Sequence, residues 1–356
     1  MDAKLGVPDR KTFLRVKELQ AEEDKEKKAQ RRVLAQTTST PPKQPPSLDQ
    51  FTAGLDQRRI LVPMTWLLLL LPLLLFLALR EQLPDSIVRP RRRRSNLDPG
   101  DLGFKFAAGN LTTSEQIELA YYYVPTTATL VRGNLVILHG KDSAKEVYLE
   151  YLPQLVPYGY NVLLYDARAH GRSGGEFTSF GYHEWQDAVL ATAKLRHLGG
   201  DYPTGVFGHS LGGAVALQAM ARSGTIEFGI VESAFTHLGR ITNAYARRQT
   251  GLPLPYGLTD ALLDRAERLA GFEHRAVEPI RAAREVTQPT LIIHGELDRS
   301  IDVDNGRQLY AALASRVKEL YIVPGAGHDD ITEIGDDGYW WRLRAFLESI
   351  THSLQA

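Results

Sequence analysis

A short apolar run passes directly into a small-residue helix at residues 205–222, and this transition constrains the fold most strongly. The segment reads GVFGHSLGGAVALQAMAR, in which Gly208, Ser210 and Gly212 form a G-x-S-x-G motif. So tight a strand-to-helix turn needs glycine two positions either side of the serine, because a Cβ there would meet the adjoining backbone. The turn exposes the hydroxyl at a helix N-terminus, where backbone N–H groups favour negative charge. We therefore predict Ser210 as a nucleophile, with His209 completing the elbow.

Apolar runs rich in β-branched and aromatic residues alternate with helix-period segments from about residue 101 to residue 356. We predict strands at Glu118–Val124, Asn134–His139, Asn161–Asp166, Gly205–His209, Phe228–Glu232, Thr290–His294 and Lys318–Val323. We predict helices at Lys145–Val156, His183–Leu198, Leu211–Arg222, Asp304–Ala314 and Tyr339–Ile350. This alternation indicates an α/β fold with a mostly parallel sheet covered on both faces. Ligands of such sheets bind at the carboxyl ends of the strands.

A serine hydroxyl needs a general base to take its proton, and ten histidines are available. We choose His328, because it follows the last predicted strand on the small-residue loop PGAGHDD, and because the base follows nucleophile and acid in this strand order. His139 and His294 each precede a glycine, so we expect them to shape turns. We expect the side chain of His209 to point to the opposite side of the elbow.

The acid that orients the base should end a late strand. In TLIIHGELDRSID, which begins at residue 290, Asp298 follows a turn at Gly295, and we choose it. Its alternative role is to cap the next helix or to pair with Arg299. Glu232, at the end of the preceding strand, is the second candidate. Either carboxylate would hold the imidazole in the required tautomer and stabilise the imidazolium.

Two backbone amides are expected to stabilise the oxyanion that forms when the serine attacks. One is the amide of Leu211, which follows the nucleophile directly. The other is assigned to the amide of Lys141, because Gly140 lets the loop after Asn134–His139 approach closely. This chemistry implies no metal and no organic cofactor.

Five motifs in the right order resemble the α/β-hydrolase superfamily. They are LHG at 138–140, YDARAHGRSGGE at 165–176, GHSLGG at 208–213, HGELDRSI at 294–301 and PGAGH at 324–328. Across about residues 115–352 they are most similar to serine aminopeptidase-like hydrolases and membrane-anchored abhydrolase-domain proteins. The resemblance implies a small helical cap at 233–288, where His237–Arg247 and Leu258–Leu269 are amphipathic. The motifs HGGG and HGGPG are missing, which argues against a typical lipase oxyanion loop and against peptidase activity.

The first 100 residues are built differently from the predicted catalytic domain at 101–356. Residues 1–59 are predicted to be a charged, disordered tail that includes a Pro-rich linker. Residues 60–79, ILVPMTWLLLLLPLLLFLAL, carry no charge. A helix of that length spans roughly 30 Å, the thickness of the bilayer core, so we predict a transmembrane helix. A cleaved signal peptide is the rival interpretation, although no small-x-small cleavage site follows Leu79.

Residues 80–100 are predicted to be a basic juxtamembrane linker. The run RRRR at 91–94 gives this side of the span more basic residues than the other, which favours a cytoplasmic catalytic domain. A cytoplasmic tail with an exported domain is nearly as well supported, since the first arrangement must export a highly charged tail. The run is also suited to anionic lipid headgroups.

Composition narrows the possible functions further. The chain has 42 basic and 42 acidic residues, which argues against a nucleic-acid binder, and it has no cysteine, which excludes thiol nucleophiles. We therefore expect a membrane-anchored serine hydrolase that cleaves a small-molecule or lipid ester or thioester through an acyl-enzyme. The alternatives are an acyltransferase or a peptidase with the same triad, and a non-catalytic binding protein. Oligomeric state is left open by the sequence.

Overall fold

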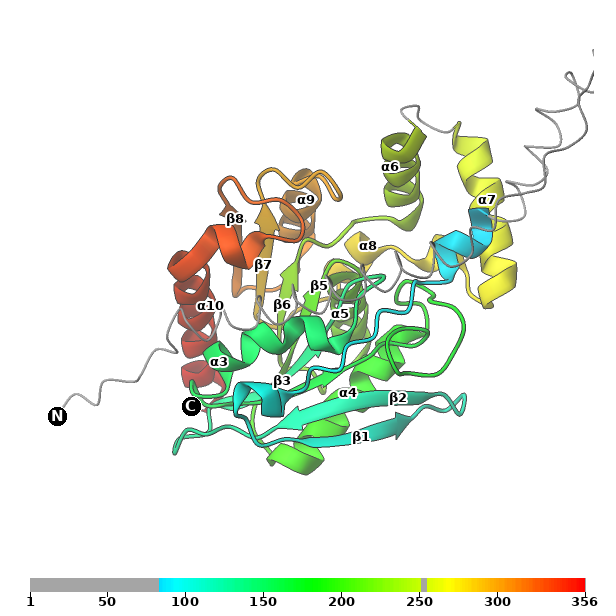
Figure 1. The fold of residues 1–356 in the computed structure, drawn as a ribbon. Coiled ribbons are helices and arrows are strands. Elements are labelled where there is room, and N and C mark those ends of the chain that lie inside the picture. Colours follow the sequence, from blue (N-terminus) through cyan, green and yellow to red (C-terminus); the bar gives the residue numbers. More distant parts are fainter. Residues whose placement is uncertain (1–82, 251–254, 356) are drawn as a thin grey trace, which may run out of the picture.

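The computed structural model describes residues 83–250 and 255–355 and is built around one sheet of eight strands (Figure 1). Their spatial order is β1-β2-β4-β3-β5-β6-β7-β8, and all pairs are parallel except β1–β2 and β2–β4. The strands are β1 (Ala107–Thr112), β2 (Glu118–Val124), β3 (Gly133–Leu138), β4 (Tyr160–Tyr165), β5 (Thr204–His209), β6 (Phe228–Glu232), β7 (Thr290–Gly295) and β8 (Lys318–Val323). The predicted mostly parallel sheet is confirmed.

Strand β1 is the one element of the sheet that the sequence analysis missed. Its sequence, AAGNLT, has no run of β-branched or aromatic residues, and most of its side chains are exposed. It pairs antiparallel with β2 at the edge of the sheet, from Ala107 opposite Tyr123 to Thr112 opposite Glu118. Pairing with a neighbour, rather than intrinsic propensity, therefore defines this strand.

Alternate residues of the central strands feed two separate cores. In β3, Val136 and Leu138 lie in one core and Leu135 and Ile137 in the other, as expected when side chains alternate across a sheet. The first core includes α4 (Glu184–Gly199), α5 (Leu211–Arg222), α8 (Pro279–Ala283) and α9 (Asp304–Ala312). The second core includes η3 (Lys145–Tyr151), α3 (Leu152–Leu155) and α10 (Ile331–Gln355). Helices thus cover both faces (Figure 1).

Two of the predicted helices differ in detail from the structure. Residues 145–156 form a 3-10 helix that continues into a single α-helical turn, with Pro153 at that turn. Proline cannot donate a backbone hydrogen bond, which explains why a regular α-helix does not extend through the segment. The last helix begins earlier than predicted, at Ile331, and is kinked at Asp336, whose φ is 45°.

The segment between β6 and β7 contains α6 (Leu238–Thr250), α7 (Tyr256–Ala270), η4 (His274–Ala276) and α8. Figure 1 shows α6 and α7 standing together, apart from the helix layers of the sheet. A single η2 turn (Pro99–Leu102) precedes β1. None of the helices within 83–250 and 255–355 is both apolar and long enough to cross a bilayer. The predicted span at 60–79 lies outside these residues.

Candidate active site

Ser210 occupies the sharp turn between β5 and α5. Its backbone has φ 55° and ψ −112°, a conformation that residues with a side chain seldom adopt. A Cβ on Gly208 would lie 2.2 Å from the carbonyl oxygen of Gly212, and a Cβ on Gly212 would lie 2.1 Å from that of Leu138. Both positions are therefore closed to any residue but glycine, and the surrounding packing holds the strained serine in place.

Three side chains from three different loops form one hydrogen-bonded chain. Nε2 of His328 lies 3.0 Å from Oγ of Ser210, and Nδ1 of His328 lies 2.7 Å from Oδ2 of Asp298. Asp298 follows β7, and His328 follows β8. The hydroxyl, imidazole and carboxylate are thus in the order needed to pass a proton from serine to histidine.

The carboxylate of Asp298 has two separate tasks. Its Oδ1 accepts hydrogen bonds from the amides of Ser300 and Ile301, at 2.7 and 2.8 Å, which fix the loop after β7. Its Oδ2 faces His328. Burial tends to raise the pKa of Asp298, but hydrogen bonds from His294, His328 and the backbone hold that pKa well below its ordinary value. Asp298 is therefore an anion at neutral pH.

His294 stands behind this carboxylate, a contact that the sequence analysis did not predict. Its Nε2 lies 2.7 Å from the carbonyl oxygen of Ile301 and 3.3 Å from Oδ2 of Asp298. A carbonyl only accepts, so Nε2 carries the hydrogen. His294 precedes Asp298 by only four residues, with a turn between them, and this spacing could have predicted the contact.

The carboxylate of Asp298 affects both the pKa and the tautomer of the His328 imidazole. Burial tends to lower the pKa of His328, but the hydrogen bond and the charge of Asp298 outweigh it, and the pKa lies above the ordinary value for histidine. The bond to Asp298 also fixes the hydrogen on Nδ1 and leaves the lone pair on Nε2 facing Ser210. Before the reaction, this is the tautomer that a general base needs.

The predicted oxyanion donors flank the nucleophile. Leu211 is the first residue of α5, where a backbone N–H has no partner within the helix. On the other side, a Cβ on Gly140 would lie 3.3 Å from Cβ of Ser210, so the loop that leads into Lys141 passes directly beside the serine. The two amides chosen from the sequence therefore belong to backbone segments that adjoin Ser210.

The second candidate acid, Glu232, pairs with a different histidine. Nδ1 of His209 lies 2.9 Å from Oε1 of Glu232, and the hydroxyl of Tyr339 donates to Oε2 at 2.7 Å. The expectation that His209 points to the far side of the elbow is wrong, because its ring centroid lies 5.0 Å from that of His328. His209 is the last residue of β5 and lies directly opposite Glu232 in β6, so the ring turns toward this buried carboxylate.

Two further histidines near the strand ends are buried and play a structural part. Nε2 of His139 accepts a hydrogen bond from the amide of Ala167 at 2.9 Å. Nδ1 of His170 lies 2.8 Å from the carbonyl oxygen of Arg168. Burial lowers the pKa of both rings, in His170 to about 3, so both are neutral.

Part of the basic segment at 91–94 lies along the hydrolase domain. The guanidinium of Arg92 donates to the carbonyl oxygens of Ser173 and Gly175, and Nε of Arg94 donates to that of Gly171 at 3.3 Å. The amide of Arg91 donates to Oδ1 of Asp142 at 2.7 Å. Asp142 follows Lys141, so this segment touches the loop that carries the predicted oxyanion donor.

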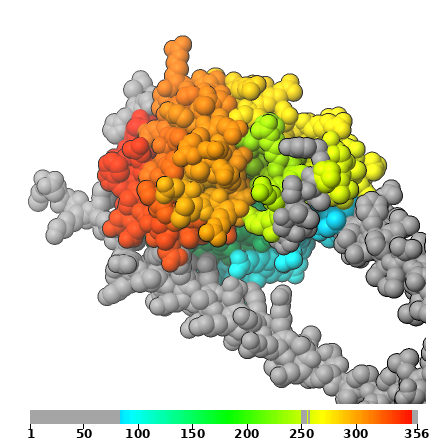
Figure 2. Space-filling model, turned by 90° about the horizontal axis from the view of Figure 1, so that it is seen from above, coloured from blue at the N-terminus to red at the C-terminus, as the bar shows by residue number. Residues whose placement is uncertain are grey.

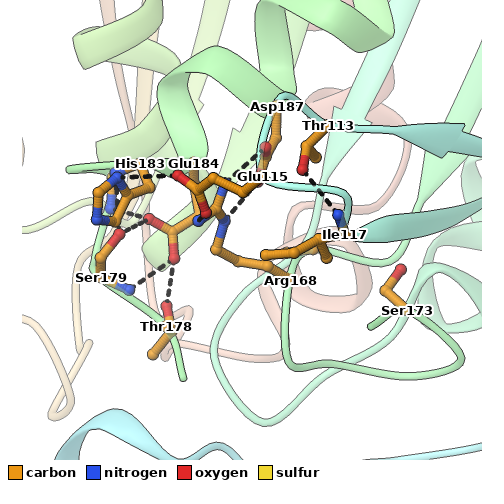
Figure 3. Close-up of polar contacts among 12 residues, drawn as sticks. Thr113, Glu115, Ile117, Arg168, Ser173, Thr178, Ser179, His183, Glu184 and Asp187 are labelled. Carbon is orange, nitrogen blue, oxygen red and sulfur yellow. Dashed lines mark hydrogen bonds and ion pairs between the residues drawn. The ribbon is translucent and has the colours of Figure 1, made fainter. Parts of the chain in front are cut away.

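A buried polar network supports the loop between β4 and α4 (Figure 3). Arg168 donates to both carboxylate oxygens of Asp187, at 2.8 and 2.9 Å, and to Glu115 at 2.8 Å. Glu184 accepts hydrogen bonds from Thr178 and from the backbone and side chain of Ser179. The network joins the β1–β2 turn to α4, and none of these bonds involves Ser210, Asp298 or His328.

The helical segment between β6 and β7, predicted as a cap, contacts the loop that contains Asp298. Nη1 of Arg248, near the end of α6, donates to the carbonyl oxygen of Arg299 at 2.9 Å. Figure 2 shows the surface of the cap, yellow-green to yellow, next to the orange surface of the β7–β8 region. The cap region and the loop after β7 are thus in direct contact.

Known proteins resemble this chain in sequence and in structure. A monoacylglycerol lipase of Mycolicibacterium smegmatis is 28% identical over 247 residues, covering 60% of this chain and 86% of the lipase. Human alpha/beta hydrolase domain-containing protein 17B is 30% identical over 189 residues, covering 52% of this chain and 56% of that protein. An esterase of Pyrococcus furiosus superposes with a TM-score of 0.62 at 25% identity, over 74% of this chain and 97% of the esterase.

The family described as serine aminopeptidase, S33, matches residues 129–248 and 268–335. The matched ranges make up more than half of the chain and include all three members of the hydrogen-bonded chain at Ser210, His328 and Asp298. They include most of the central sheet as well. This protein therefore belongs to the serine aminopeptidase S33 family of α/β hydrolases.

Proposed function

We propose that this protein is a membrane-anchored serine hydrolase that cleaves carboxylic esters through an acyl-enzyme on Ser210. The observation that carries the proposal is the hydrogen-bonded chain from Ser210 through His328 to the anionic Asp298. Two relatives support an ester substrate, since one is named a monoacylglycerol lipase and the other an esterase.

The reaction follows from these contacts. Oγ of Ser210 attacks the ester carbonyl carbon while Nε2 of His328 takes the hydroxyl proton. The resulting oxyanion is stabilised by the amides of Leu211 and Lys141. When the intermediate collapses, His328 gives its proton to the leaving alcohol, and the acyl group stays on Ser210. Water then repeats the sequence, releases the acid and restores the serine.

Anchoring by the apolar run at 60–79 is part of the proposal. It would hold the catalytic domain within a short tether of a bilayer, since the predicted linker spans only residues 80–100. Such proximity favours lipid-derived esters over freely soluble ones. Activity-based labelling of intact against permeabilised cells would report which side of the membrane carries the site.

The full-length protein in detergent should hydrolyse p-nitrophenyl esters and bind a fluorophosphonate probe covalently. Ser210→Ala should abolish both, because no other side chain can take over the attack. Ser223→Ala is the matched control, since Ser223 is a half-buried serine that follows α5 and whose side chain hydrogen-bonds with Thr225. Retention of labelling in Ser210→Ala would refute the proposal.

The family description names an aminopeptidase, so a peptide substrate is the competing function. Aminoacyl p-nitroanilides and p-nitrophenyl esters share a chromophore and differ in the bond that is cleaved. We expect the ester series to be turned over faster by at least an order of magnitude. A reversed preference would assign the same triad to a peptidase.

A further inference from the structure

A second imidazole paired with a carboxylate lies next to the proposed triad, and the ester reaction does not use it. The rings of His209 and His328 are 5.0 Å apart between centroids and tilted by 54°. Nδ1 of His209 faces Oε1 of Glu232 at 2.9 Å. The side chain of Glu232 is only 3% exposed, and its second oxygen accepts from Tyr339.

The two carboxylates give both imidazoles the same tautomer. An ionised carboxylate only accepts hydrogen bonds, so Nδ1 of His209 carries a hydrogen and its Nε2 carries the lone pair. The same holds for His328, whose Nδ1 faces Asp298. A histidine backed by a carboxylate at one nitrogen, with a free lone pair at the other, is the usual form of a histidine metal ligand.

A third ligand is adjacent. Asp329 directly follows His328, and its side chain is exposed. One ring nitrogen each from His209 and His328 and one carboxylate oxygen from Asp329 lie within 4.8 Å of one another. Zinc–ligand bonds of about 2 Å bring such atoms to within roughly 3.5 Å of each other, so rotation of the exposed Asp329 side chain would close most of the difference.

We propose that His209, His328 and Asp329 form an inhibitory site for zinc. Two imidazoles and one carboxylate suit Zn²⁺ and leave a fourth position for water, whereas Mg²⁺ and Ca²⁺ prefer sites made of oxygen atoms. The bound ion would occupy the lone pair with which His328 takes the proton of Ser210. Zinc therefore inhibits reversibly by removing the general base. The inhibition rests on the proposed esterase function, whereas binding of the ion rests on the geometry alone.

Inhibition tests the site in the working enzyme. Hydrolysis of p-nitrophenyl butyrate by the full-length protein in detergent should fall with added ZnCl₂, recover with EDTA and be unaffected by MgCl₂. In Asp329→Asn the half-inhibitory zinc concentration, measured against that variant's own uninhibited rate, should rise by about tenfold or more. Asp264→Asn is the control, because Asp264 belongs to the other described group with metal-ligand spacing, with Glu267 and His274 in the cap.

Direct binding separates this proposal from the proposed function. Ser210→Ala lacks the nucleophile but keeps all three ligands, and calorimetric titration with ZnCl₂ should show one site. Adding Asp329→Asn or His209→Gln to Ser210→Ala should weaken that site about tenfold or more. Equal zinc affinity in these variants, or loss of inhibition only in Asp264→Asn, would overturn the proposal. If zinc binding weakens in the Asp329→Asn and His209→Gln variants but the protein has no esterase activity, the metal site is upheld and the proposed function is refuted.

Discussion

Asp298 holds His328 with one carboxylate oxygen, at 2.7 Å, and holds the loop after β7 with the other. The same residue therefore fixes the loop and contacts the imidazole of the proposed base. Asp298 does not cap the next helix, because the N-cap of α9 is Val303; its Oδ1 instead accepts from two amides of the loop itself. This division makes the two contributions separable by mutation.

Asp298→Asn should reduce activity without unfolding the loop. The amide oxygen of asparagine can still accept from Ser300 and Ile301, but the negative charge beside His328 is lost. We expect kcat/KM for a p-nitrophenyl ester to fall by roughly 10⁴-fold, because the imidazolium is no longer stabilised and the required tautomer is no longer enforced. The melting temperature should change far less than in a variant that removes both oxygens, such as Asp298→Ala. Equal activity in Asp298→Asn and the wild type would exclude Asp298 as the orienting acid.

The pH dependence of kcat/KM should report His328. The base must be neutral to take the serine proton, and Asp298 holds its pKa above the ordinary value of about 6.5. The value of kcat/KM should therefore increase with pH as the imidazolium of His328 loses its proton, and the midpoint of that increase should lie above pH 6.5. In Asp298→Asn the residual activity should titrate at lower pH, since the stabilising charge is absent. A shift of the ionisation in the opposite direction would contradict this arrangement.

Gly212→Ala should prevent the elbow from forming. The added methyl would lie 2.1 Å from the carbonyl oxygen of Leu138, and backbone cannot yield as a side-chain tip can. We expect a loss of stability of about 3 kcal/mol or more, measured by chemical denaturation, or failure to fold. Gly224→Ala is the control, because nothing lies within 4 Å of a Cβ at that glycine. A stable, active Gly212→Ala variant would mean that the turn has another geometry.

Arg168→Met should destabilise the domain without touching the reacting groups. It leaves the carboxylate of Asp187, whose side chain is 1% exposed, without the guanidinium that pairs with it. Removing one partner of a buried ion pair costs roughly 3–5 kcal/mol, so the melting temperature should fall clearly. Arg307→Met is the control: it removes an exposed ion pair with Asp304, and the melting temperature should stay close to the wild-type value.

A compensating change distinguishes lost charge pairing from lost packing at this network. If the unpaired carboxylate is the main cost, Arg168→Met combined with Asp187→Leu should recover part of the stability, because no buried charge is then left alone. If the double variant instead has a lower free energy of unfolding than Arg168→Met, lost packing of the two side chains is the main cause of the destabilisation.

The strands and the elbow could be predicted because their signals are local. β2, β6 and β8 begin and end at the predicted residues, and α5 begins directly after the serine of the G-x-S-x-G motif. Hydrophobic periodicity, and the need for glycine where a Cβ would clash, involve only a few neighbouring residues, so both can be recognised in the sequence. To choose Ser210, Asp298 and His328, the only further information needed was the order in which the strands of such a sheet follow one another. The catalytic roles of the three residues stay predictions, which the variants above test.

Contacts between distant segments were decided by the tertiary structure alone. Ser210 and His328 are 118 residues apart, and their 3.0 Å contact exists because β5 and β8 end at the same edge of one sheet. No local pattern in the sequence indicates the pairing of Glu232 with His209 instead of His328, or the contact of Arg91 with Asp142. The sequence by itself was enough to nominate Ser210, Asp298 and His328, since that choice depends on residue type and on neighbours along the chain. Which of those residues face one another depends on how the strands assemble, because burial and hydrogen bonding act between segments that only the folded chain brings together.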